Sequence, residues 1–180
     1  MNNRKKIFAI SGSTRSNSSN LRLLKRIAAL TTTDFELTIF EGISELPHFN
    51  PDLDNETPPQ SVADFRRQVA EADGIIICTP EYVFSLPGSL KNALEWCVST
   101  TVFSRKPVGL ITASASGEKA HEELQLVMKT IETLFNVDTL LLVKGIKGKI
   151  NEEGIITHPE TAAQIDTFIQ AFKKLVEEKV

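Results

Sequence analysis

Short apolar runs alternate along the chain with segments whose apolar residues recur every three or four positions. The runs predict five strands, at residues 5–11, 35–41, 74–79, 107–114 and 137–143. The helical spacing predicts five helices, whose apolar residues lie at 21–28, 62–72, 85–98, 124–135 and 162–176. The run at 74–79 is apolar almost throughout, whereas 35–41 alternates. We therefore expect the first at the centre of a sheet and the second near an edge.

Alternating strands and helices predict a doubly wound α/β fold. Parallel strands need crossover connections, and the helices in those crossovers cover both faces of the sheet. No linker is long enough to separate two domains, so we expect residues 1–180 to form a single domain, with 42–59 as a long ordered loop. Ligands in such folds bind beyond the carboxyl ends of the strands, so the candidate site residues should follow them.

A polar loop, GSTRSNSSN, follows the first predicted strand and leads directly into a helix. The N-terminus of a helix favours an anion because its free N–H groups and the positive end of its dipole lie there. Arg15 adds a positively charged guanidinium, whose parallel N–H donors suit phosphate oxygens. The loop lacks both the Lys of a P-loop and the G-x-G-x-x-G dinucleotide pattern, so a single phosphate suits it best. The alternative is a turn with a helix cap and no ligand, since Ser, Thr and Asn favour such positions.

A second loop, within TPEYVFSLPGSLKNALEW, follows the third predicted strand. Two prolines, a glycine and the aromatic ring of Tyr82 favour a rigid wall against which a flat ligand could lie. Pro87 is expected in the first turn of the helix that follows, where a missing N–H does no harm. The alternative is that these side chains only pack the loop.

Charge and composition exclude several function classes. A net charge of −3 gives no support for a nucleic-acid or anionic-membrane partner. The sequence has no apolar stretch of about 18 residues and no signal-peptide pattern, so we expect a cytoplasmic protein. Cys78 and Cys97 fit reduced, packed thiols. The three histidines share no metal-ligand spacing, so no metal is expected.

Together the two loops resemble those of the NADPH-dependent FMN reductases, a flavodoxin-like group that includes quinone, chromate and azo-dye reductases. The family pattern is roughly G-S-x-R-x-x-S-x-N in the first loop and P-E-Y-N-x-S-x-P-G-x-L-K-N-A-x-D/E-W in the second. The resemblance implies strand order 2-1-3-4-5 and noncovalently bound FMN. It also implies electron transfer from NADPH or NADH through FMN to a small acceptor: a quinone, a flavin, an azo compound or a metal oxyanion. A homodimer or homotetramer is implied too, and Trp96 and Phe103, if partly exposed, would suit its interface.

The resemblance also implies cofactor-binding residues. Those that match the phosphate loop are Ser13, Arg15, Ser18, Ser19 and Asn20. Those in the second loop, expected to line the isoalloxazine ring mainly through backbone groups, are Pro80, Glu81, Tyr82 and Val83. Ser114 and Gly117 follow the fourth strand, near the pyrimidine edge of the ring.

Two departures alter the ring half of the expected site. Val83 stands where the family usually has Asn, so one polar contact is missing. The stretch ASASGEKAHEE has a single glycine where relatives have a Gly-rich segment. Glu81 could act as a base, but a loop carboxylate is more often solvated or caps a backbone, and we favour that interpretation.

The sequence shows no catalytic triad or paired carboxylates, which fits chemistry carried by a cofactor. Two other function classes remain open. A flavodoxin-like electron carrier would bind FMN without a nicotinamide site, although such carriers are usually far more acidic. A flavin-free binding or regulatory module would suit the altered ring half.

Overall fold

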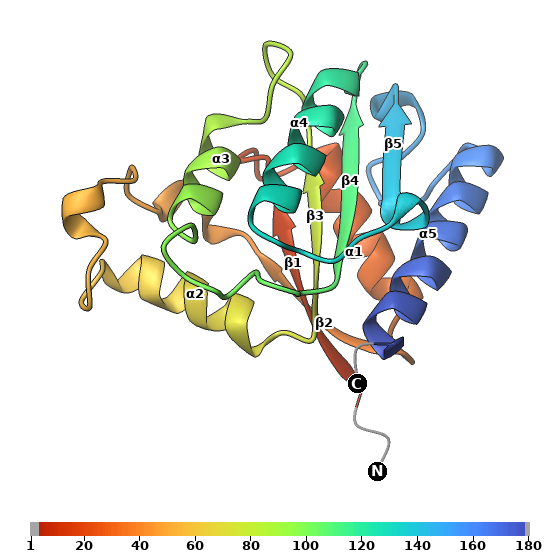
Figure 1. Ribbon diagram of the computed structural model, residues 1–180. Helices are drawn as coiled ribbons and strands as arrows, with labels where there is room; N and C mark the ends of the chain where they lie inside the picture. Colours follow the sequence, from red (N-terminus) through yellow and green to blue (C-terminus); the bar gives the residue numbers. More distant parts are fainter. Residues whose placement is uncertain (1–3, 179–180) are drawn as a thin grey trace.

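The computed structural model describes residues 4–178, and its centre is a sheet of five parallel strands (Figure 1). The strands are β1 (Lys5–Ser11), β2 (Phe35–Phe40), β3 (Gly74–Thr79), β4 (Val108–Ser114) and β5 (Leu140–Lys144). Their order is β2-β1-β3-β4-β5, and every neighbouring pair is parallel. This arrangement confirms the predicted doubly wound, flavodoxin-like fold class.

Five α-helices cover the two faces of the sheet (Figure 1). They are α1 (Ser19–Leu30), α2 (Gln60–Glu71), α3 (Gly88–Glu95), α4 (Glu118–Thr130) and α5 (Pro159–Glu178). One apolar core lies under α2, α3 and α4, and a second lies under α1 and α5. Four 3-10 turns complete the described chain, at Gly42–Glu45, Pro51–Leu53, Val137–Thr139 and Ile146–Gly148.

The burial of the strands follows their positions in the sheet. Every residue of the central strand β3 is buried, because helices pack on both of its faces. β2 is an edge strand, and only Phe35 is fully buried in it. Both observations confirm the positions predicted from the apolar patterns.

Helix α3 is shorter than the predicted 85–98. Ser85 belongs to a hairpin turn, in which it exchanges two backbone hydrogen bonds with Tyr82 at 3.0 and 3.1 Å. Pro87 has an extended ψ of 136° and precedes the helix instead of lying in its first turn. The helix therefore begins at Gly88.

Helix α4 and strand β5 also differ from the predicted ranges. Glu132 adopts a left-handed φ of 61°, which stops the helix before Leu134 and Phe135. Residues 137–139 then form a 3-10 turn capped by the Asn136 side chain, so β5 begins at Leu140 and not at residue 137.

Trp96 and Phe103 do not lie at the surface, so the partial exposure on which their predicted interface role depended is absent. Both side chains are buried in the core under α2, α3 and α4. The Trp96 indole Nε1–H donates to the Pro47 carbonyl at 2.8 Å, and its ring packs edge-on against Phe49. The loop at 42–59 thus folds over the indole and covers it.

Candidate functional site

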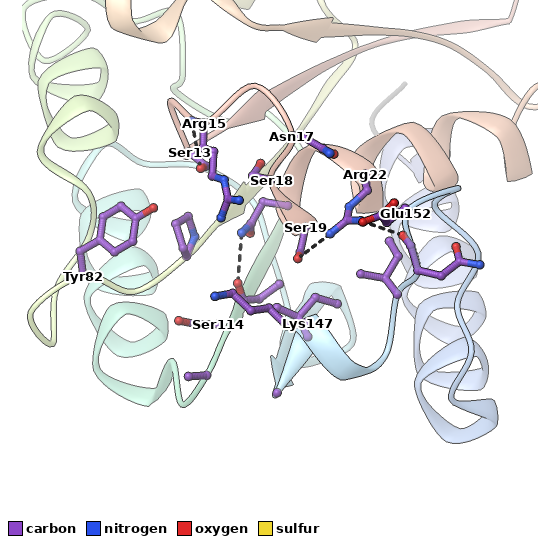
Figure 2. Close-up of a pocket in the computed structure, with 18 of the residues that line it drawn as sticks. Ser13, Arg15, Asn17, Ser18, Ser19, Arg22, Tyr82, Ser114, Lys147 and Glu152 are labelled. Atoms are coloured by element: carbon purple, nitrogen blue, oxygen red, sulfur yellow. Dashed lines mark hydrogen bonds between the residues drawn. The ribbon is translucent and has the colours of Figure 1, made fainter.

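A pocket of about 900 Å³ opens beyond the carboxyl ends of the strands (Figure 2). Four segments line it: residues from 13 to 22, Pro80 with Tyr82, Ala113 to Ala115, and residues from 145 to 153. The first two follow β1 and β3, and the third is the end of β4 with the residue after it. The structure therefore brings together the two loops that sequence analysis singled out.

Tight packing shapes the β1–α1 loop. The Gly12 N–H donates to the Cys78 carbonyl at 2.9 Å, which continues the sheet into the loop. A side chain at Gly12 would bring a Cβ within 2.5 Å of Thr79 Oγ1, so only glycine fits there. Ser18 then caps α1, because its Oγ accepts from the Leu21 N–H at 3.1 Å. The cap is present, and the same residue lines the pocket.

Asn20 connects α1 to the centre of the sheet. Its Nδ2 donates to the Ala113 carbonyl at 3.1 Å, and its Oδ1 accepts from the buried Cys78 thiol at 3.2 Å. Burial raises the pKa of Cys78 well above its ordinary value, so the thiol stays protonated and is not a nucleophile. Asn20 thus fixes the position of the loop, and it also lines the pocket.

Three cationic side chains line the pocket: Arg15, Arg22 and Lys147. Figure 2 shows Arg15 reaching in from the β1–α1 loop, with Arg22 on the other side of Ser18 and Ser19. Within residues 4–178, none of the three has a carboxylate within ion-pair distance. With the N-terminus of α1 beside them, they make this part of the pocket suited to an anion.

The opposite wall consists of Pro80 and Tyr82. Figure 2 shows Tyr82 on the far side of Arg15 from Arg22. The next two residues, Val83 and Phe84, form the tip of the hairpin, and both have positive φ, at 52° and 58°. Such a turn favours Asn, whereas a β-branched Val is strained there. Val83 is 94% exposed and does not line the pocket, so its difference from the family pattern concerns the turn.

Glu81 caps a helix and does not face the pocket. Its Oε1 accepts from the Gly117 N–H at 3.2 Å and its Oε2 from the Ala120 N–H at 3.0 Å, at the start of α4. Gly117 adopts φ 95° immediately before that helix. The backbone-cap interpretation of Glu81 is confirmed, and neither Glu81 nor Gly117 lines the pocket.

Two further side chains, Ser114 and Glu123, fix the second loop. Ser114 lines the pocket, and its Oγ accepts from the Glu81 N–H at 3.2 Å. Glu123 of α4 accepts from the Ser85 hydroxyl at 2.7 Å and from the Leu86 N–H at 3.0 Å. Both sides of the hairpin are therefore tied to neighbouring elements.

One wall of the pocket, which follows β5, was not predicted from the sequence. It comprises Gly145 to Lys147 and Ile150 to Glu153, and it faces Asn17 and Arg22, which were also missed. The rule that ligands bind beyond the strand ends applies equally to β5 and is the signal that would have found this wall.

Residues 4–178 contain no group of three potential metal ligands among His, Cys, Asp and Glu side chains. His121 hydrogen-bonds through Nδ1 to Thr112 Oγ1 at 2.9 Å, and burial lowers its pKa. Across the same residues, no helix combines the length and the apolar character that a membrane crossing requires.

Comparisons with known proteins place the chain in one family. The model of the NADPH-dependent FMN reductase family matches residues 5–144. A 2-hydroxy-1,4-benzoquinone reductase from Burkholderia sp is 31% identical, with 97% of each chain covered. A quinone reductase from Escherichia coli strain K12 is 27% identical, over 92% of this chain and 88% of that one.

Solved structures show the same likeness. The flavoenzyme NAD(P)H:(acceptor) oxidoreductase FerB from Paracoccus denitrificans superimposes with a TM-score of 0.84 at 26% identity, covering 97% of this chain and 98% of the other. The family match spans all five strands and three of the four segments that line the pocket. On these grounds, the chain belongs to the NADPH-dependent FMN reductase family.

Proposed function

We propose that this protein is an NAD(P)H-dependent oxidoreductase that holds FMN in the pocket and reduces a small acceptor of the quinone type. The observation that carries the proposal is the pocket itself, which joins a cationic phosphate cradle to a wall with an aromatic ring. The names of the relatives, a benzoquinone reductase and a quinone reductase, support the acceptor class.

The pocket residues fit FMN. Ser13, Ser18, Arg15 and the first N–H groups of α1 would hold the phosphate, because they offer hydroxyl donors, a forked cation and a positive helix end. Pro80 and Tyr82 would lie along the ring system. When bound, FMN supplies the hydride chemistry, and the protein contributes binding and orientation.

Ser114 and Ala115 border the same pocket at the end of β4. Because the Ser114 Oγ accepts from the Glu81 N–H, its hydroxyl hydrogen is left to donate to a ligand. Glu81 itself is occupied by the N-terminus of α4, so we assign it no proton transfer. The residues of the second loop would therefore bind the flavin and would not transfer protons.

The purified protein is expected to bind FMN, to show flavin absorption bands and to oxidise NADPH or NADH when a quinone is added. FMN should bind more tightly than riboflavin, because riboflavin leaves the cations and N–H groups of the cradle without a partner. Fluorescence titration with both flavins measures this preference. Equal affinity for riboflavin and FMN would contradict the phosphate cradle.

The same experiment separates the two alternatives. A protein that binds FMN but does not oxidise the nicotinamide would be an electron carrier. A protein that binds no flavin would be a binding or regulatory module.

We further propose a homodimer in which the hairpin tip lies at the interface, and a cytoplasmic location. Val83 and Phe84 are 94% and 77% exposed, and a partner at this tip would bury both apolar side chains. The two cysteines are buried free thiols, which suits a reducing compartment. A two-fold dimer would also help to close an open pocket edge.

Sedimentation velocity at micromolar concentration is expected to show a dimer, and the double variant Val83→Asn/Phe84→Gly is expected to shift it to monomer. Asn-Gly is the pair that such a hairpin turn favours, so the variant removes both apolar side chains and keeps the turn. The circular dichroism spectrum should be unchanged. A wild-type monomer, or a variant that remains fully dimeric, would refute this interface.

A further inference from the structure

Arg22 lies in the first turns of α1, on the side of the helix that faces the pocket. Its Nη2 donates to Ser19 Oγ at 3.3 Å, so the guanidinium is one side chain away from the phosphate cradle. Its Nη1 donates to the Asn151 carbonyl at 3.0 Å, on the wall that follows β5. Figure 2 shows Arg22 between Ser19 and that wall. Arg22 is not part of the motif that identifies the family.

The charge on Arg22 is only partly compensated within the described residues. The side chain is half-buried and has no carboxylate within ion-pair distance, although Glu152 and Glu153 line the same pocket. Its Nε–H is buried and has no hydrogen-bond partner in residues 4–178. A half-buried guanidinium with unused donors is costly unless an anion compensates it. Because Arg22 lines the pocket, an anion bound there would compensate the charge that its contacts with Ser19 and Asn151 leave.

A second cation would balance the charge of the proposed ligand. A phosphate monoester loses its second proton near pH 6 and carries about two negative charges above that pH. Arg15 supplies one positive charge, and the N-terminus of α1 adds roughly half of another. Lys147 also borders the pocket, but its side chain is exposed, and an ammonium on a flexible stem lacks the planar fork that suits phosphate. The Arg22 guanidinium is oriented by Ser19 and Asn151, so it can neutralise the remaining negative charge of the phosphate.

We propose that Arg22 is the second cation of the flavin phosphate site and makes the pocket selective for the dianionic phosphate. This inference rests on the proposed function, because it assigns a residue to the FMN site. It goes beyond that function by predicting a dependence of FMN affinity on the protonation of the phosphate.

No other group around the phosphate is expected to mimic this pH dependence. The charged or titratable side chains that face Arg22 across the pocket are Arg15, Tyr82, Lys147, Glu152 and Glu153. No histidine lines the pocket, and histidine is the side chain whose ordinary pKa lies between about pH 5 and pH 8. The phosphate itself is therefore the group that changes charge in this range.

The test uses protein loaded with FMN or with riboflavin, and measures dissociation constants from the recovery of flavin fluorescence on dilution. Wild-type affinity for FMN should rise from about pH 5 to about pH 8, as the phosphate becomes a dianion. Arg22→Gln should weaken FMN binding about tenfold at the upper pH and flatten the pH dependence, since the lost interaction is with the second negative charge. Riboflavin affinity should not change.

Two further variants complete the design. Arg22→Lys keeps the charge and should retain most of the pH dependence while losing affinity through the missing fork. Lys25→Gln removes a positive charge from an exposed position on the same helix, outside the pocket, and should behave as wild type. Melting curves of all variants report whether the fold is intact.

Two results would overturn the assignment of Arg22. One is unchanged FMN affinity in Arg22→Gln while wild type binds FMN normally, which would leave the proposed function in place. The other is an equal loss of FMN and riboflavin affinity, which would mean that Arg22 only holds the wall at Asn151. Failure of wild type to bind any flavin would instead refute the proposed function.

Discussion

Replacing Arg15 with Ala is expected to weaken FMN binding about ten- to a hundredfold and to leave the stability of the flavin-free chain unchanged. A charge-assisted hydrogen bond to phosphate contributes roughly 1.5–3 kcal/mol, which corresponds to this loss of affinity. The side chain is exposed and has no ion-pair partner in residues 4–178, so it contributes little to folding. Fluorescence titration and melting curves measure the two quantities separately.

Ser18→Ala is the matched comparison, because Ser18 lies in the same loop and has a known structural role. Loss of its cap on α1 should lower the free energy of unfolding by about 1 kcal/mol with or without flavin. Unchanged FMN affinity in both variants would mean that the GSTRSNSSN loop forms only a turn and a helix cap and does not bind the phosphate. That result would remove the main residue-level support for the proposed function.

Trp96→Ala is expected to lower the free energy of unfolding by about 3–5 kcal/mol, the range found for large aromatic residues in cores. The variant loses a fully buried indole, its hydrogen bond to the Pro47 carbonyl and its edge contact with Phe49. It also loses the ring beneath Arg66, whose guanidinium carbon lies 6.0 Å from the ring centroid. The loop at 42–59 should therefore lose one of its anchors, while Asn92 still bonds to Pro47 and Phe49.

Urea unfolding followed by circular dichroism measures the effect, since the variant lacks the chain's one tryptophan and its fluorescence. Val98→Ala provides the control, because Val98 is 65% exposed and its truncation should change stability by less than about 0.5 kcal/mol. If Trp96→Ala dissociated the oligomer with unchanged stability, the core position of the indole would be contradicted.

The alternation of apolar runs and helical spacing was sufficient to predict the fold class. Fully buried strands such as Gly74–Thr79 leave a continuous apolar run, which is typical of a strand covered on both faces. Periodicity does not give the order of the strands in the sheet, however, and the order 2-1-3-4-5 was predicted from the family resemblance. The helix ends were less accurate, because α4 stops where Glu132 takes a positive φ that its residue type does not favour.

The site was predictable where its residues are consecutive. The GSTRSNSSN loop combines hydroxyl groups, a cation and the start of a helix in one stretch, so an anion-binding site can be predicted from it. The wall from 145 to 153 follows β5, so the strand-end rule predicts it, but its contact with Arg22 is made by a backbone carbonyl, which no residue type indicates. Trp96 was misplaced because its burial depends on a distant loop that folds over it.

Hydrogen bonds of Glu81 and Glu123 hold the second loop in place before any ligand binds. Glu81 holds the start of α4, and Glu123 of α4 holds Ser85 and Leu86, so the hairpin is fixed from both sides by groups outside the pocket. Ordering a loop on binding costs conformational free energy that is subtracted from affinity. A wall already held in place avoids that cost, so the contacts of the ligand with Pro80 and Tyr82 contribute almost fully to its affinity.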